Sequence, residues 1–348
     1  MNVRNLLHSI KHSGNTTRLI VGALVLTIIV IPLYFLLWQS NTFEVSPKIV
    51  PVSRGETFGQ VADALNSAGV LTHPSLFKLS GKLFGYAGKL KIGKYSFHSG
   101  MSNRELLYAI STGTSTANPA VTIYEGIRGT AMARILKREV GIDSVKFAQL
   151  LSDTSLIRLP NHGASSLEGF LLPDTYEFYW QLDEKEIVHE LLAQFRRFFS
   201  DSLQERTRRL NMSVSDVLTM ASIVEGETIL DNERPIIAGL YYNRLRRRMK
   251  LEADPTIQYI IPDGPRRLLY TDLKIESPYN TYQKYGLPPG PINNPGRKSI
   301  LAALYPAKNN YLYFVADGTG GHRFARTYDE HLKNVRSYRR ARALAKAK

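Results

Sequence analysis

The chain has 348 residues, a formal net charge of +15 and no cysteine. Its length fits two domains of roughly 150 residues each, and its apolar content of 43% is enough to fill sizeable cores. The lack of cysteine excludes disulfides, cysteine-ligated zinc and thiol catalysis. No cluster of His, Asp and Glu has the spacing of a metal site, and we expect neither a metal nor a cofactor.

An uncharged apolar stretch runs from Leu19 to Trp38. Twenty helical residues rise about 30 Å, the thickness of one bilayer core. A secretory signal would have a shorter apolar region and a small-residue cleavage site. Tyr34, Phe35 and Leu37 occupy the positions where small residues would be needed. Unbroken hydrophobicity also disfavours a buried core helix, so the pattern predicts a retained transmembrane helix.

Charge predicts the orientation of this helix. Three basic residues and no acidic ones precede it, and the first charged residue after it is Glu44; the basic residues are Arg4, Lys11 and Arg18. Positive charge stays inside, so we expect a cytoplasmic tail (1–17), a single span (18–38) and a periplasmic remainder of a cell inner membrane protein. That location disfavours nucleic acid as a partner, and the basic charge then fits anionic lipid headgroups or an anionic envelope polymer.

A linker (39–48) and a small module (49–115) follow the span. A strand from Ile49 leads through a Gly turn into a helix with apolar residues at helical spacing. A second strand at 92–97 precedes a helix that Ser102 and Glu105 open as a capping box. Compact β-α units of this size resemble LysM-like modules, which bind aminosugar polymers.

The strand, Gly turn and helix of residues 50–71 recur at 121–142. Internal duplication and the common use of β-α units both explain this recurrence. We place the module boundary near 115, followed by a catalytic domain (116–335). A basic tail (336–348) completes the chain, and it either contacts lipid or is a solvated helix end.

The larger domain is predicted to be mostly helical with a small sheet, which makes the fold class α+β. One long amphipathic helix is expected at 183–210, with further helices at 213–228 and 232–249. The Pro- and Gly-rich stretch 277–296 cannot be helical, and we interpret it as an ordered loop over a cleft. A buried strand is expected at 311–317 and a helix at 322–335.

Two glutamates, Glu225 and Glu227, lie in an otherwise apolar stretch. Projected at about 100° per residue, Glu225 falls within the apolar stripe and Glu227 falls on the far side, as a rim or solvent residue would. Burial raises the pKa of an unpaired carboxyl and keeps it protonated, which suits a general acid. The alternative is that a buried arginine, Arg234 or Arg244, or backbone donors hold Glu225 in a structural role.

Seven motifs then occur in the order seen in one family: "LEGFLLPDTY" (167–176), "ASIVEGET" (221–228), "YNRL" (242–245), "LEADPTIQY" (251–259), "SPYNTY" (277–282), "GLPPGPINNPG" (286–296) and "YLYFVADGTGGHRFARTYDEH" (311–331). With the single span, they resemble the membrane-anchored, YceG-like endolytic murein transglycosylases. Gly226 departs from the family, whose members often carry Lys there.

The resemblance implies cleavage of the β-1,4 bond between N-acetylmuramic acid and N-acetylglucosamine within nascent peptidoglycan strands, which terminates their elongation. The muramic acid 6-hydroxyl attacks its own anomeric carbon and leaves a 1,6-anhydro end, without water. The family's catalytic Glu, taken as the first of the motif, corresponds to Glu225. The resemblance also implies penicillin-binding proteins as partners.

Other motif residues fit substrate contact or bracing of the cleft. Tyr279, Asn280 and Tyr282 can contact N-acetyl sugars, and Glu168 and Tyr176 line or brace the cleft. Asn243 and Arg244 lie one turn from the apolar Leu240, where Arg244 can tune Glu225. Asp254 is the best candidate for a second acid, although an N-cap ahead of Pro255 suits it better. His322 lies in a Gly-rich turn and is a poor catalytic candidate.

Two rival functions remain. One is a true hydrolase, which needs a second carboxylate to activate water and would use Asp254 as its base. The other is a non-enzymatic scaffold that binds cell wall and docks synthases. An intramolecular nucleophile already has a high effective concentration, so a lytic enzyme can operate with one Glu.

Overall fold

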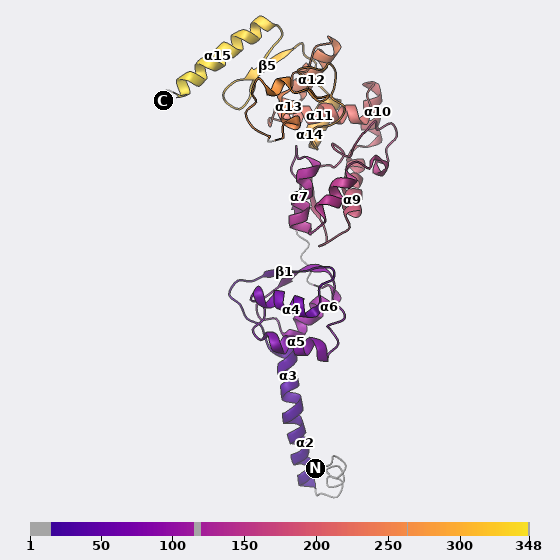
Figure 1. Ribbon diagram of the computed structural model, residues 1–348, viewed down its shortest axis with the longest axis vertical. Helices are drawn as coiled ribbons and strands as arrows, with labels where there is room; N and C mark the ends of the chain where they lie inside the picture. Colours follow the sequence, from indigo (N-terminus) through magenta and orange to yellow (C-terminus); the bar gives the residue numbers. More distant parts are fainter. Residues whose placement is uncertain (1–14, 115–119, 263, 347–348) are drawn as a thin grey trace. The chain divides into compact units, whose positions relative to one another are not determined.

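The computed structural model describes residues 15–114, 120–262 and 264–346, and its chain divides into two compact units (Figure 1). Unit 1 holds the described residues before Ala120 together with Tyr179–Gln181. Unit 2 holds Ala120–Phe178 and the chain from Leu182 onward. The boundary predicted near residue 115 and most of the predicted cytoplasmic tail lie outside the described residues.

Unit 1 begins with a nearly continuous helix of three segments: α2 (Asn15–Val25), a π-helical turn η1 (Leu26–Val30) and α3 (Ile31–Trp38). Leu19–Trp38 has a mean hydropathy of 2.8, and no other helix in the described part of the chain is as long and apolar. Its apolar side chains are mostly exposed within the chain itself. These properties suit a single-pass membrane anchor.

The rest of unit 1 is a small α/β module with its own core. It comprises β1 (Lys48–Val52), α4 (Phe58–Ser67), α5 (Pro74–Leu83), β2 (Gly93–Phe97) and α6 (Asn103–Thr112). Strands β1 and β2 pair antiparallel, with Val50 opposite Tyr95. The predicted capping box of Ser102 and Glu105 is confirmed, since each side chain bonds to the backbone N–H of the other. We did not predict α5, whose Phe77 packs on Phe58 at the centre of the core.

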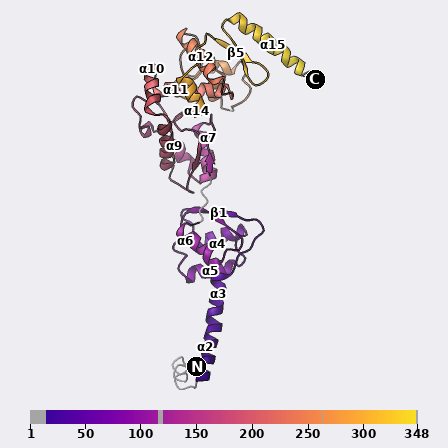
Figure 2. The ribbon, with the colours of Figure 1, turned by 180° about the vertical axis from the view of Figure 1, so that it is seen from behind.

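The anchor helix is joined to this module at its last turn. Its Leu36 carbonyl accepts hydrogen bonds from the Ser80 hydroxyl of α5 (2.7 Å) and the Asn103 side-chain amide of α6 (3.0 Å). Leu37 is buried against the module, and Figure 2 shows α5 at the end of unit 1 that receives the helix. A backbone carbonyl at a helix end normally lacks a partner, so these bonds satisfy it and fix the helix to the module.

Unit 2 is mostly helical, with two separate two-stranded sheets. In chain order its elements are β3 (Ala120–Thr122), α7 (Gly129–Val140), α8 (Ser144–Leu150), the 3-10 turn η2 (Thr154–Leu156), β4 (Thr175–Glu177), α9 (Glu184–Phe198), α10 (Asp201–Arg209), α11 (Val214–Glu227), α12 (Arg234–Arg246), α13 (Asp254–Ile260), the 3-10 turn η3 (Asp272–Lys274), α14 (Arg297–Leu304), β5 (Tyr313–Ala316), β6 (His322–Ala325) and α15 (Tyr328–Lys346). β3 pairs with β4 and β5 pairs with β6, both antiparallel. The predicted mixture of helices with small sheets is confirmed, as is the non-helical stretch 277–296.

Three predictions for unit 2 are wrong in detail. The helix expected at 183–210 is two helices, because Phe199 leaves the helical conformation (ψ 64°) and buries its ring against Phe195. Strand β5 is half-buried rather than buried, since it belongs to a two-stranded hairpin at the edge of the unit. Residues 322–325 form its partner strand β6 instead of starting a helix, because the Gly-rich turn before them closes a hairpin.

One buried side chain ties three loops of unit 2 together. Asn294 is fully buried, and its amide oxygen accepts from the backbone N–H groups of Gly169 (2.8 Å) and Leu171 (3.2 Å). Its amide nitrogen donates to the Ile127 carbonyl (3.0 Å) and to the Glu168 carboxyl (2.6 Å). The motifs at 167–176 and 286–296 therefore meet at this residue, next to the loop that precedes α7.

We predict that Asn294→Ala lowers the free energy of unfolding by about 2–4 kcal/mol, because it leaves buried backbone N–H groups without acceptors. Urea unfolding of the detergent-solubilised full chain measures this change. Asn310→Ala removes an exposed asparagine of the same unit and should change stability by less than about 0.5 kcal/mol. Equal stability of both variants would contradict the bracing role of Asn294.

Candidate active site

Glu225 and Glu227 lie in the last turn of α11, a helix that is buried along most of its length. A capping box of Ser213 and Asp216 starts the helix, and all of its residues from Val217 to Val224 are buried. Helices α12, α13 and α14 pack against it. From Val217 to Val224 the helix has no solvent side, and only its last turn, at Gly226, is exposed. A helical projection of the apolar residues therefore cannot assign one glutamate to the interior and the other to water.

Glu225 is held by an ion pair and a backbone donor. Its carboxylate lies 2.9 Å from the Arg234 guanidinium and accepts the Gly296 N–H at 2.9 Å. The Arg234 side chain is 6% exposed and also donates to the Ser299 hydroxyl (2.5 Å). Glu225 thus matches the structural alternative that the sequence left open, in which a buried arginine and backbone donors hold it.

Glu227 has no such cation. Its carboxyl accepts the Tyr241 hydroxyl at 2.6 Å, and within the described part of the chain no Lys, Arg or His side chain pairs with it at ion-pair distance. Burial raises the pKa of Glu227 to about 7, and the nearby Asp254 charge adds to the rise, whereas the Tyr241 bond and the Arg244 charge oppose it. Of the predicted rim or solvent position, the rim is confirmed: Glu227 is half-buried rather than exposed, and it lines two pockets.

Two pockets meet at Glu227 and Asp254, which line both of them. The larger has a volume of about 870 Å³ and is bounded by the loop before α7, the start of α7, and α13; its polar side chains include Arg128, Arg134 and Gln258. The smaller, about 280 Å³, is bounded by Arg244, Tyr282, Tyr313 and His331, among others. A chain-like ligand lying in both pockets would pass over the Glu227 carboxyl.

Asp254 is the first residue of α13, not its N-cap as predicted. Ala253 occupies the cap position, and the Asp254 carboxylate instead accepts the Tyr282 hydroxyl at 2.5 Å. The side chain is exposed at the junction of the two pockets. Gly226 permits this arrangement, because a Cβ there would lie 2.6 Å from the Pro255 ring. The glycine lets the start of α13 approach the end of α11.

Five of the motif residues brace the fold instead of lining these pockets. Glu168 accepts the Gly129 N–H at the start of α7 (3.0 Å), and burial raises its pKa to about 7. The others bond to backbone groups or pack on rings. Tyr176 donates to the Leu172 carbonyl, Asn243 to the Asn309 and Tyr311 carbonyls, and Asn280 to the Leu273 and Ile275 carbonyls, while the Tyr279 ring packs on Tyr259.

Arg244 and Tyr282 do line the smaller pocket, although Arg244 is largely engaged elsewhere. Its guanidinium donates to the Leu312 and Leu251 carbonyls and pairs with Glu252 at 3.0 Å. It acts on Glu227 through its charge.

Sequence reasoning missed Tyr241 and His331. Tyr241 is a buried aromatic residue directly before the "YNRL" motif, without any pattern of its own. The His331 ring stacks on Tyr313 in the smaller pocket, and its Nδ1 is buried without a partner among the described residues. His322, by contrast, bonds to Glu233 at 2.7 Å outside both pockets. No group of three His, Asp or Glu in the described ranges could hold a metal ion.

Comparison with known proteins agrees with this architecture. An endolytic murein transglycosylase of Bacillus subtilis is 30% identical over 303 residues, which cover 83% of this chain and 84% of the relative. One of Streptococcus pneumoniae is 29% identical over 82% of this chain but only 57% of its own length. The crystal structure of a YceG-like protein from Listeria monocytogenes has a TM-score of 0.61 and 29% identity, covering 83% of this chain and 98% of that one. Residues 50–337 match the profile of the YceG-like family, and the chain belongs to that family.

Proposed function

We propose that the protein is an endolytic lytic transglycosylase, which cleaves the β-1,4 bond between N-acetylmuramic acid and N-acetylglucosamine within peptidoglycan strands and leaves 1,6-anhydro ends. The family and the names of the relatives support this reaction. The single observation that carries the assignment of the site is a desolvated carboxyl, Glu227, which forms no salt bridge in the described part of the chain and lies where two pockets meet.

Glu227 takes the acid–base role in place of Glu225. With a pKa of about 7 it is substantially protonated at neutral pH, so it can give its proton to the glycosidic oxygen as the bond from that oxygen to the anomeric carbon breaks. The resulting carboxylate then accepts the proton of the 6-hydroxyl as that oxygen bonds to the same carbon. Glu225 is committed to Arg234 and instead holds the end of α11 in place.

The two pockets support cleavage within a strand. A glycan lying in both would place sugars on either side of Glu227, so neither chain end needs to be at the site. One acid is enough for this reaction, because the nucleophile, the 6-hydroxyl, belongs to the substrate and needs no second carboxylate to activate water.

The hydrolase alternative would use Asp254 as the base for water. Asp254 lies beside Glu227 but already accepts the Tyr282 hydroxyl. Its charge raises the pKa of Glu227, which makes it an electrostatic partner of the acid. Product mass separates the alternatives, because an anhydro end is lighter than a reducing end by one water.

The cellular setting extends this proposal. The apolar helix anchors the chain in an inner membrane with its short basic tail in the cytoplasm and the catalytic part in the periplasm. The order β1–α4–α5–β2, with its strands paired antiparallel, supports a LysM-like module that contacts the glycan. Cutting nascent strands close to the membrane would terminate their elongation and bring the enzyme near penicillin-binding proteins, its proposed partners.

We predict that Glu227→Gln lowers the rate of anhydro-end formation by roughly 10²–10⁴-fold, because the variant lacks a general acid. Mass spectrometry of peptidoglycan fragments made by the full chain in detergent measures the products. Glu225→Gln should lower stability and, in the folded protein, slow cleavage far less than Glu227→Gln does. Glu276→Gln, which changes an exposed glutamate of the same unit, should match wild type. A folded Glu227→Gln protein with full activity, beside an inactive folded Glu225→Gln, would return the role to Glu225. If wild type and both variants bind peptidoglycan strands but none of them cleaves these strands, the scaffold function would be favoured.

A second prediction concerns pH. Because the reaction needs protonated Glu227, kcat/KM should fall as pH rises through about 7. The Tyr241 hydroxyl stabilises the carboxylate form, so Tyr241→Phe should raise the pKa of Glu227 and move this alkaline limb upward by up to about one pH unit. Initial rates of anhydro-end formation between about pH 5 and pH 9 measure the shift. If the alkaline fall in kcat/KM occurs at the same pH in Tyr241→Phe as in wild type, a group other than Glu227 determines it.

A further inference from the structure

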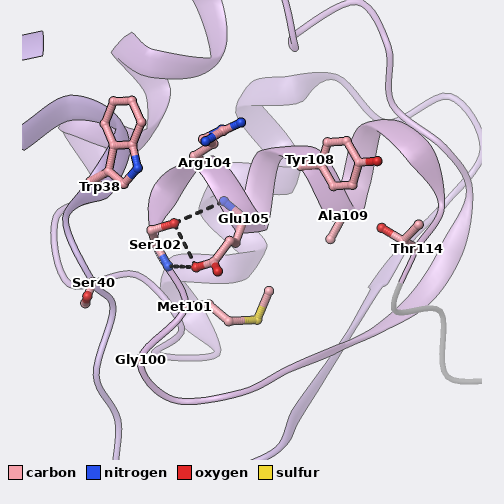
Figure 3. A pocket seen from close by; sticks show the side chains of 10 residues that line it. All are labelled: Trp38, Ser40, Gly100, Met101, Ser102, Arg104, Glu105, Tyr108, Ala109 and Thr114. Carbon is pink, nitrogen blue, oxygen red and sulfur yellow. Dashed lines mark hydrogen bonds between the residues drawn. The ribbon is translucent and has the colours of Figure 1, made fainter. Parts of the chain in front are cut away.

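A third pocket, outside the proposed active site, lies where the anchor helix enters unit 1. It has a volume of about 590 Å³, within the size range of small-ligand sites. Its wall begins at Trp38, the last residue of the apolar span, and continues along α6 (Figure 3). Tryptophans at the end of a span sit at the level of lipid headgroups, and the fixed joint at Leu36 keeps this pocket at that level.

The pocket contains one cation, Arg104, that forms no salt bridge in the described part of the chain. Arg104 is exposed, and its guanidinium lies 5.6 Å from the centre of the Trp38 ring. Among the residues that the structure describes, no carboxylate comes within ion-pair distance of it. A guanidinium offers paired donors that match the oxygens of a phosphate.

One carboxylate lines the same pocket. Glu105 accepts the Ser102 backbone N–H (2.7 Å) and hydroxyl (2.8 Å) through a single oxygen. Those bonds lower the pKa of Glu105, so it is charged at neutral pH. In the described part of the chain its other carboxyl oxygen accepts no hydrogen bond. Two exposed aromatic rings, Trp38 and Tyr108, complete the wall and offer faces that attract an ammonium group.

We propose that this pocket binds a phosphoethanolamine lipid headgroup, with its phosphate on Arg104 and its ammonium beside Glu105 and the aromatic rings. A purely anionic headgroup would be repelled by the negative charge of Glu105. A choline headgroup carries no N–H to donate to that carboxylate. The pocket therefore selects a zwitterionic headgroup with a primary amine, and it adds a specific lipid contact to the non-specific anchoring by the apolar helix.

The test uses the full chain in detergent and short-chain phospholipids with ethanolamine, choline or glycerol headgroups. Trp38 reports binding by its fluorescence in a Trp180→Phe background, because the chain has only two tryptophans. We expect the ethanolamine lipid to bind most tightly, and Arg104→Ala to weaken it by about 10- to 100-fold. Arg54→Ala, which removes an exposed cation of unit 1 outside the pocket, should leave binding unchanged.

Glu105→Gln provides the sharper control. Glutamine can also complete a capping box, so α6 keeps its cap while the pocket loses its negative charge. This variant should lose the preference for ethanolamine over glycerol headgroups and still bind phosphate. Equal binding of all three lipids by wild type, or unchanged binding by Arg104→Ala, would overturn the proposal.

Discussion

The ion pair between Glu225 and Arg234 is the interaction on which the candidate site depends. It joins the last turn of α11 to the first turn of α12, and the Ser299 and Gly296 contacts extend the link to α14. Removing one partner of a buried pair leaves an uncompensated charge, at a cost of about 3–5 kcal/mol. Glu227 follows only two residues later, so the same pair fixes where its carboxyl enters the pockets.

The two glutamates at the end of α11 differ in their partners. The Glu225 carboxyl accepts from the Arg234 guanidinium and from the Gly296 N–H. Glu227 accepts a hydrogen bond from the neutral Tyr241 hydroxyl, and desolvation together with the Asp254 charge raises its pKa against that bond and the Arg244 charge. These different partners distinguish Glu225 from Glu227, the acid that we propose.

Much of this architecture could be predicted from local sequence. The apolar span, the capping box at Ser102, the helices α11 and α12 and the irregular stretch 277–296 follow from hydrophobic period and from Pro and Gly, which act within a few residues. The choice between Glu225 and Glu227 could not, because it depends on Arg234, Tyr241 and the close approach of α13 at Gly226. These are contacts between separate elements, and a projection of α11 alone treats its far side as water.

The same limit explains the motif residues that turned out to brace the fold. Glu168, Asn243 and Asn280 are polar residues within motifs, a pattern that suits substrate contact. Each instead satisfies backbone groups of loops that no helix or sheet would pair. An unpaired buried backbone group costs about as much as a lost hydrogen bond. A site built largely from irregular loops therefore needs many polar side chains to hold its walls, and few remain for the ligand. In unit 2, polar side chains that line the pockets, such as Asp254 and Tyr282, lie around Glu227.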